Sequence, residues 1–210
     1  MTPPACNAVV VYLCQPDFVL TQEGATLIAI ANTLARVKKC RFAGRWDDSD
    51  RHSGGVFFVP DETLIASEAS RLGIWSACDL FGGVVPYAFV RTKAVTHGLV
   101  SDDAERPAGW SDVFAKRVQD VVLPGYTVFS VCDAQRAASK LLSDASLRLK
   151  KTLAAGGRGQ SLARTVTEVD AILETLSPEE LSHSGLVIES DLTDVTTLSV
   201  GQVILDDLMI

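Results

Sequence analysis

The chain has 210 residues, of which 47% are hydrophobic, so it can form one large or two small globular domains and is not expected to be disordered. Its net charge of −7 excludes nucleic acids and anionic membranes as partners bound by bulk electrostatics. Five scattered cysteines without a C-x-x-C pair are typical of free thiols in a reducing compartment. No apolar run reaches the length needed to span a bilayer, and we expect a cytoplasmic protein.

The first ninety residues alternate between strand and helix patterns. In chain order we expect a buried strand over 8–13, a helix over 21–39, strands over 40–42 and 56–59, and a helix over 62–72. Asp61 is a suitable N-cap for the last helix, and Gly73 is a suitable residue to end it. This alternation predicts an α/β fold class, with a small open α/β domain over residues 1–90.

A turn-rich segment over 80–86 indicates a domain boundary near residues 86–91. Beyond it we expect helices beginning near residues 92, 111, 133, 167 and 177, and strands over 126–129, 147–150, 186–189 and 198–205. Strands and helices alternate less regularly here, so α+β is the expected class of this second half.

The segment over 147–161 is the most informative for chemistry. Lys150 ends a predicted strand, and Gly156, Gly157, Arg158 and Gly159 follow in a loop. Glycines allow backbone N–H groups to close on an anion, and a lysine supplies the compensating charge, so the pattern suits a polyphosphate. It is not a P-loop, because G-x-x-x-x-G-K-[ST] is absent. The alternative is a glycine-rich hairpin that serves only to turn the chain.

Two further charged residues extend this pattern. Glu189 ends an apolar strand, where a carboxylate needs a donor such as one of the lysines or the amine edge of a ligand. Lys93 adds a cation just past the domain boundary. The alternatives are a solvated lysine and a carboxylate at the surface end of a strand.

This ordered set of lysines, glycine-rich loop and glutamate resembles the ATP-grasp superfamily. At finer grain, the segments 79–87, 92–97, 156–160 and 196–203 resemble an uncharacterised bacterial ATP-grasp-like family. The resemblance implies a Rossmann-like pre-ATP-grasp domain over 1–90, a first ATP-grasp subdomain over 91–185, and the start of an incomplete second lobe over 186–210.

The resemblance also implies roles for individual residues. Lys93 and Lys150 would neutralise the phosphates of ATP, the loop of Gly156, Gly157, Arg158 and Gly159 would cover them, and Glu189 with Leu192 would hold adenine. The implied activity is an ATP-dependent carboxylate–amine ligase that works through an acylphosphate, with a nucleotide and a carboxylate as small-molecule partners. Mg²⁺ is expected only if the missing lobe is supplied, and no residue is assigned as catalytic or as a metal ligand.

Departures from the superfamily pattern keep other functions open. Thr197 stands where a ribose-binding glutamate is often found, with Asp194 as a substitute, and Lys151 stands where many members have proline. The alternative is a truncated or degenerate non-catalytic module that binds a nucleotide or a protein. A flavodoxin-like site after Leu13 is disfavoured, because Gln15-Pro16-Asp17 is not a suitable phosphate loop.

Two more expectations concern histidines and sheet edges. His52, His97 and His183 form no metal-ligand spacing, so we expect them at the surface or in support of a site. The strands over 186–189 and 198–205 would lack sheet partners in an incomplete lobe. This predicts an exposed sheet edge and homodimerisation through it.

Overall fold

The structure is a computed structural model that describes residues 6–14, 21–49, 53–142, 146–154, 158–196, 198, 200–205 and 208–209. The chain forms two compact units, one comprising Met1–Pro86 with Ser199–Ile210 and the other comprising Tyr87–Leu198. Both contain helices and sheets, which confirms the α/β class. Among the described residues, no helix has the length and apolar character needed to cross a membrane.

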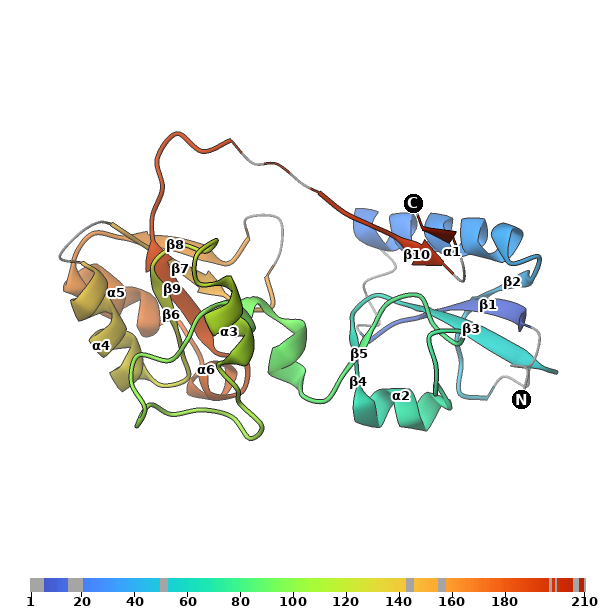
Figure 1. Ribbon diagram of the computed structural model, residues 1–210, viewed down its shortest axis with the longest axis horizontal. Coiled ribbons are helices and arrows are strands. Elements are labelled where there is room, and N and C mark those ends of the chain that lie inside the picture. Colours follow the sequence, from blue (N-terminus) through green and yellow to red (C-terminus); the bar gives the residue numbers. More distant parts are fainter. Residues whose placement is uncertain are drawn as a thin grey trace. The chain divides into compact units, whose positions relative to one another are not determined.

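The first unit is built around a three-stranded parallel sheet with the order β2-β1-β3. Its elements are β1 (Cys6–Tyr12), α1 (Gln22–Val37), β2 (Arg41–Arg45), β3 (Gly55–Pro60), β4 (Leu64–Ile65), α2 (Ala66–Leu72), β5 (Val84–Val85), β10 (Ile204–Leu205) and β11 (Leu208–Met209). Helices α1 and α2 lie on opposite sides of this sheet (Figure 1). Val9 and Val11 pack on the α1 side and Val10 on the α2 side, which explains the continuous apolar run of β1.

Helix α1 has well-defined ends. The Thr21 hydroxyl accepts a hydrogen bond from the Gly24 N–H at 3.0 Å. At the other end Lys39 adopts a positive φ of 55°, the N–H of Lys39 donates to Arg36 O and the N–H of Cys40 donates to Ala35 O. This is a Schellman motif, and it leads the chain directly into β2.

Two predictions in the first unit are wrong in detail. Helix α2 begins at Ala66 rather than at 62, because Leu64 pairs with Val84 in a parallel ladder. Asp61 is therefore not its N-cap, and its carboxylate instead accepts from the Cys14 N–H at 2.8 Å. Of the strand expected over 198–205, only β10 is a strand among the described residues, and it pairs with β11.

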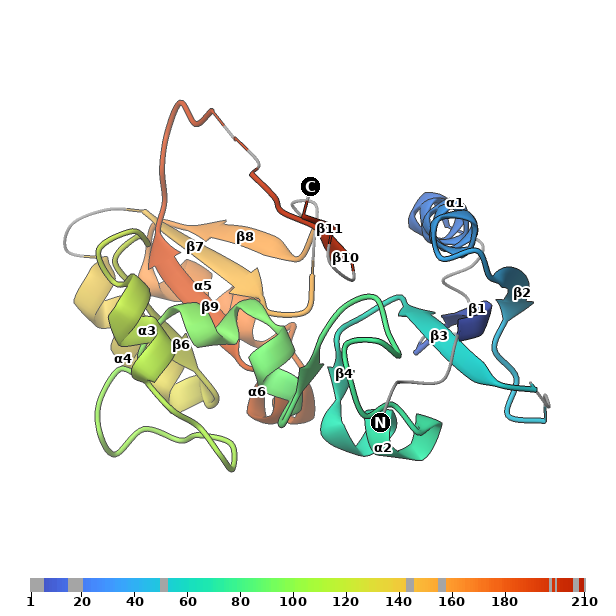
Figure 2. The same cartoon turned by 45° about the vertical axis from the view of Figure 1, so that its right-hand side comes forward.

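The second unit contains a four-stranded antiparallel sheet with the order β6-β9-β7-β8. Its elements are η2 (Ala88–Arg91), η3 (Lys93–Thr96), α3 (Val113–Val118), β6 (Gly125–Val128), α4 (Val131–Leu141), β7 (Leu147–Lys151), β8 (Gln160–Ala163), α5 (Val166–Leu173), α6 (Pro178–Ser184) and β9 (Leu186–Ser190). Helices α4 and α5 pack on one face, and Figure 2 shows α5 behind β7 and β9. Strand β9 pairs on both sides, so the expectation that 186–189 lacks sheet partners is wrong.

Local capping explains two more differences from the predicted helices. Ser130, not Asp133, caps α4, and its hydroxyl accepts from the Asp133 N–H. The helix expected near residue 92 consists of two 3-10 turns, η2 and η3. The Thr92 hydroxyl accepts from the Ala94 N–H and so caps the second turn. These turns place Lys93 and the following histidine beside the sheet.

Candidate functional site

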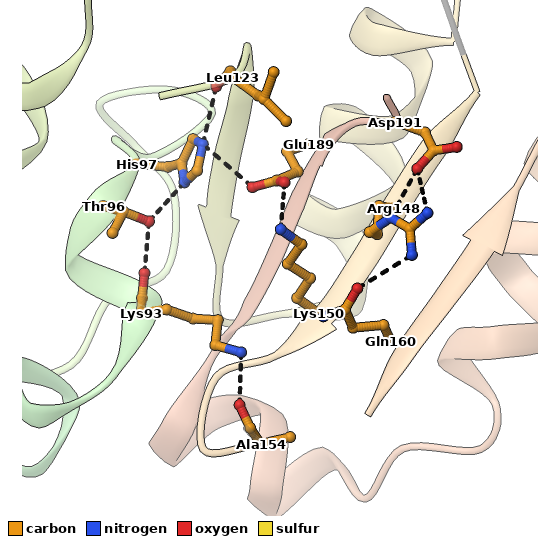
Figure 3. A network of polar contacts seen from close by, with 10 residues as sticks. All are labelled: Lys93, Thr96, His97, Leu123, Arg148, Lys150, Ala154, Gln160, Glu189 and Asp191. Atoms are coloured by element: carbon orange, nitrogen blue, oxygen red, sulfur yellow. Dashed lines mark hydrogen bonds and ion pairs between the residues drawn. The ribbon is translucent and has the colours of Figure 1, made fainter. Parts of the chain in front are cut away.

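The sheet of the second unit has one apolar and one polar face. Leu147 and Leu149 of β7 lie in the core with α4 and α5. Because side chains alternate along a strand, Arg148 and Lys150 project from the opposite face. Glu189 lies directly across from Arg148 in the register between β7 and β9 and therefore shares this polar face (Figure 3).

Glu189 is the centre of the polar face. It is only 6% exposed, and its Oε1 accepts from the ammonium Nζ of Lys150 at 2.5 Å. Its second oxygen, Oε2, lies 3.8 Å from Nε2 of His97, which is also buried. A buried carboxylate requires a compensating donor. Of the two donors that the sequence left open, a lysine or a ligand amine, the structure shows a lysine, Lys150.

His97 contributes a neutral ring to this cluster. Burial lowers its pKa below the ordinary 6.5 and Lys150 lowers it as well, against the opposing effects of the Leu123 carbonyl and the Glu189 carboxylate. Nε2 lies 3.0 Å from Leu123 O, which can only accept, so the neutral ring carries its proton on Nε2. Nδ1 lies 2.8 Å from the Thr96 hydroxyl oxygen, and this hydroxyl donates to Lys93 O at 2.7 Å.

Gly125 makes room for the approach of His97 to Glu189. A Cβ at this position would lie 2.7 Å from Ile188 O, 2.8 Å from the Glu189 Cβ and 2.8 Å from Cδ2 of His97. All three are closer than a real Cβ approaches its neighbours. The absence of a side chain at the start of β6 is therefore a requirement of this packing.

Lys93 brings a second ammonium group to the polar face. Its Nζ donates to Ala154 O at 2.6 Å, in the loop between β7 and β8 (Figure 3). Burial lowers the pKa of Lys93 and the charge of Lys150 lowers it further, whereas Glu189 raises it. Among the described residues, no carboxylate forms an ion pair with Lys93.

The β7–β8 hairpin depends on Gly159. This residue has a φ of +62°, and its carbonyl accepts from the Lys151 N–H at 2.8 Å. A Cβ there would lie 2.7 Å from that of Ala154, whose carbonyl accepts from Lys93. The glycine thus allows the two arms of the hairpin to approach each other next to the Lys93 ammonium.

A second ion pair lies further along the same face. Nε of Arg148 donates to Oδ1 of Asp191 at 2.7 Å, and Nη1 donates to Oε1 of Gln160 at 3.1 Å. Gln160 belongs to β8 and Asp191 directly follows β9, so the guanidinium is held by partners on both sides of β7 (Figure 3). Arg148 and Asp191 therefore neutralise each other, as Lys150 and Glu189 do.

The structure brings Lys93, Lys150 and Glu189 together and places Gly159 in the adjoining hairpin. The other residues expected at the site lie elsewhere or outside the described part of the chain. Arg158 is exposed next to Gly159, Leu192 is 50% exposed beyond β9, and Gly156, Gly157 and Thr197 lie outside the described residues.

Sequence reasoning missed Arg148, Asp191 and Gly125 as members of the site. Strand alternation could have found Arg148, two residues before Lys150, and Asp191, two residues after Glu189. Of the histidines, His97 supports the site, His183 is exposed and His52 lies outside the described residues. Within the described part of the chain, no group of three His, Cys, Asp or Glu residues could hold a metal ion.

Comparison with known proteins changes the family assignment. No curated protein matches the chain. Residues 16–210 match a family described as proteins of unknown function, designated DUF3182. This match overturns the assignment to the ATP-grasp superfamily, because the family that covers nearly the whole chain carries no such description. The chain belongs to the DUF3182 family.

Proposed function

We propose that the second unit binds ATP through its polyphosphate on the polar face of the β6-β9-β7-β8 sheet. In this proposal Lys93 and Lys150 contact the phosphates, and Glu189 positions Lys150. The observation that carries the proposal is the position of the two ammonium groups. They come from distant segments of the chain, and Lys93 contacts the hairpin that follows the strand of Lys150.

The charge balance of the polar face favours an anionic ligand. It contains three cations, Lys93, Arg148 and Lys150, and two carboxylates that pair with the last two cations. His97 is neutral, so one positive charge has no counterpart within the cluster. A phosphate near Lys93 would supply the missing negative charge. It would also raise the pKa of the Lys93 amine, against the burial that lowers it.

Calorimetric titration of the full chain with ATP, with and without Mg²⁺, tests this proposal. Lys93→Ala is the most informative variant, because it leaves the Lys150–Glu189 ion pair intact. Loss of one charge-assisted contact is expected to weaken binding about tenfold. Lys151→Ala is the matched control, since this neighbouring lysine pairs with the exposed Glu180. It should change the affinity less than about twofold.

Titrations with inorganic tripolyphosphate and with AMP separate the contribution of the phosphates to ATP binding from that of the nucleoside. If the phosphates supply the binding energy, tripolyphosphate binds and AMP binds far more weakly than ATP. Absence of binding at millimolar ATP would contradict the proposal, as would equal losses in Lys93→Ala and Lys151→Ala. Those results would favour the second candidate, a structural role for the charges, which the mutual neutralisation of Lys150 and Glu189 supports.

For the first unit, we infer a small Rossmann-like arrangement. The support is the parallel order β2-β1-β3, with α1 joining β1 to β2 and the helices α1 and α2 on opposite sides of the sheet. The rest of the proposed function does not depend on this inference.

A further inference from the structure

Two cysteines that are distant in sequence meet where the parallel strands β1 and β2 begin. Cys6 is the first residue of β1, and Cys40 directly precedes β2, the parallel neighbour of β1. Their Sγ atoms lie 2.6 Å apart, which is about 0.5 Å more than the length of a disulfide bond. The remaining cysteines are not in this cluster, and Cys78 and Cys132 are exposed.

The backbone on both sides holds the sulfur atoms in place. The Schellman motif at the end of α1 positions Cys40, whose N–H donates to Ala35 O at 2.8 Å. Its thiol lies 3.0 Å from the carbonyl oxygen of Cys6 and 3.3 Å from that of Lys38. Cys6 belongs to the ladder between β1 and β3. Bond formation therefore requires movement of the side chains rather than a rearrangement of the fold.

We propose that Cys6 and Cys40 are a redox-active pair that forms an intramolecular disulfide on reaction with a disulfide oxidant such as oxidised glutathione. The thiolate of Cys40 attacks one sulfur of the oxidant and releases one glutathione thiolate. The Cys6 thiol then loses its proton and attacks Sγ of Cys40, which displaces the glutathione from the mixed disulfide. The cysteines lose two electrons and two protons, and one oxidised glutathione becomes two reduced ones.

The surroundings of Cys6 assign it the second step. Burial raises its pKa to about 12, the neighbouring Cys40 sulfur also raises it, and the Lys38 cation opposes both effects. Cys6 is therefore protonated at neutral pH, and the reaction should accelerate as the pH rises. The bond would join the start of β1 to the residue directly before β2, and so close a loop that contains the whole of α1.

The test is incubation of the full chain in glutathione buffers from reducing to oxidising, followed by acid quenching, alkylation and mass spectrometry. We expect the mass of the monomer to fall by two hydrogens and peptide mapping to identify a Cys6–Cys40 link. The doubly substituted Cys78→Ser, Cys132→Ser protein should form the same link, since both residues lie outside the pair. Cys40→Ser should abolish it.

Thermal unfolding supplies a readout that needs no substitution. The oxidised wild-type protein should unfold several degrees above the reduced protein, because the link restricts the unfolded chain. Glutathione adducts without a Cys6–Cys40 link would overturn the proposal. So would links that involve the other cysteines, or disulfide-linked dimers in place of the intramolecular bond.

Discussion

Lys150 and Lys151 are consecutive residues of β7 whose side chains leave the sheet on opposite faces. Lys150 pairs with the buried Glu189 of the neighbouring strand, whereas Lys151 pairs with the exposed Glu180 of α6. The chemistry of the two ion pairs is the same, but their surroundings differ. One is part of a cluster with His97 and Lys93, and the other lies in contact with solvent.

The difference shows which sheet face of this fold can offer charged side chains to a ligand. In the first unit both faces of the sheet are covered, and Val9, Val10 and Val11 of β1 are all buried. In the second unit one face is covered by helices and the other carries charges held by mutual pairing. A buried ion pair is costly to break, whereas an exposed one contributes little. The polar face combines charges that are fixed by mutual pairing with Lys93, for which no carboxylate partner is found among the described residues.

The largest expected effect comes from removal of Glu189. Glu189→Ala leaves the Lys150 ammonium without its partner beside a buried face, and we expect the free energy of unfolding of the second unit to fall by about 3 kcal/mol. Glu180→Ala removes the exposed counterpart and should cost less than about 0.5 kcal/mol. Urea denaturation measures both, and similar losses in the two variants would remove the distinction between the faces.

A smaller effect is expected from Gly125→Ala. The added Cβ would overlap Ile188 O, Glu189 and His97, so we expect a loss of about 2 kcal/mol. Gly98→Ala is the matched control, because a Cβ there meets no atom within 4 Å, and it should cause no loss. If both variants are equally stable, close approach at Gly125 is not what holds His97 against Glu189.

The smallest effect concerns pH. His97 binds a proton less readily in the folded protein than in the unfolded chain, because burial lowers its pKa below 6.5. Acid therefore favours the unfolded chain, and the free energy of unfolding should fall as the pH drops below about 6.5. Urea denaturation at pH 7.5 and pH 5.5 should show this fall in the wild type and in His183→Asn, whose histidine is exposed. A fall of the same size in His97→Asn would show that another group causes it.

Local patterns predicted much of this arrangement. The strands that carry Lys150 and Glu189 were both predicted from local sequence, and the expected helix start near residue 177 matches α6, which Ser177 caps. The need of Glu189 for a donor follows from the cost of burying a carboxylate. The sequence left this donor open between a lysine and a ligand, and in the structure Lys150 pairs with Glu189.

The features that could not be predicted depend on pairing between strands that are distant in sequence. Strand β9 lies between β6 and β7, and this order brings Gly125 opposite Glu189 and so places His97 in the cluster. The start of α2 depends in the same way on a distant partner, because Leu64 pairs with Val84. Local propensity does not contain such pairings, and tertiary contacts override it where they form.

Backbone amide chemical shifts of the ¹⁵N-labelled full chain, followed during titration with ATP, test the central claim most directly. If the polar face binds the polyphosphate, the largest changes should occur at Lys93, Lys150 and Gly159, and they should weaken strongly in Lys93→Ala. Changes confined to the first unit, or no changes at millimolar ATP, would contradict a nucleotide site on this face.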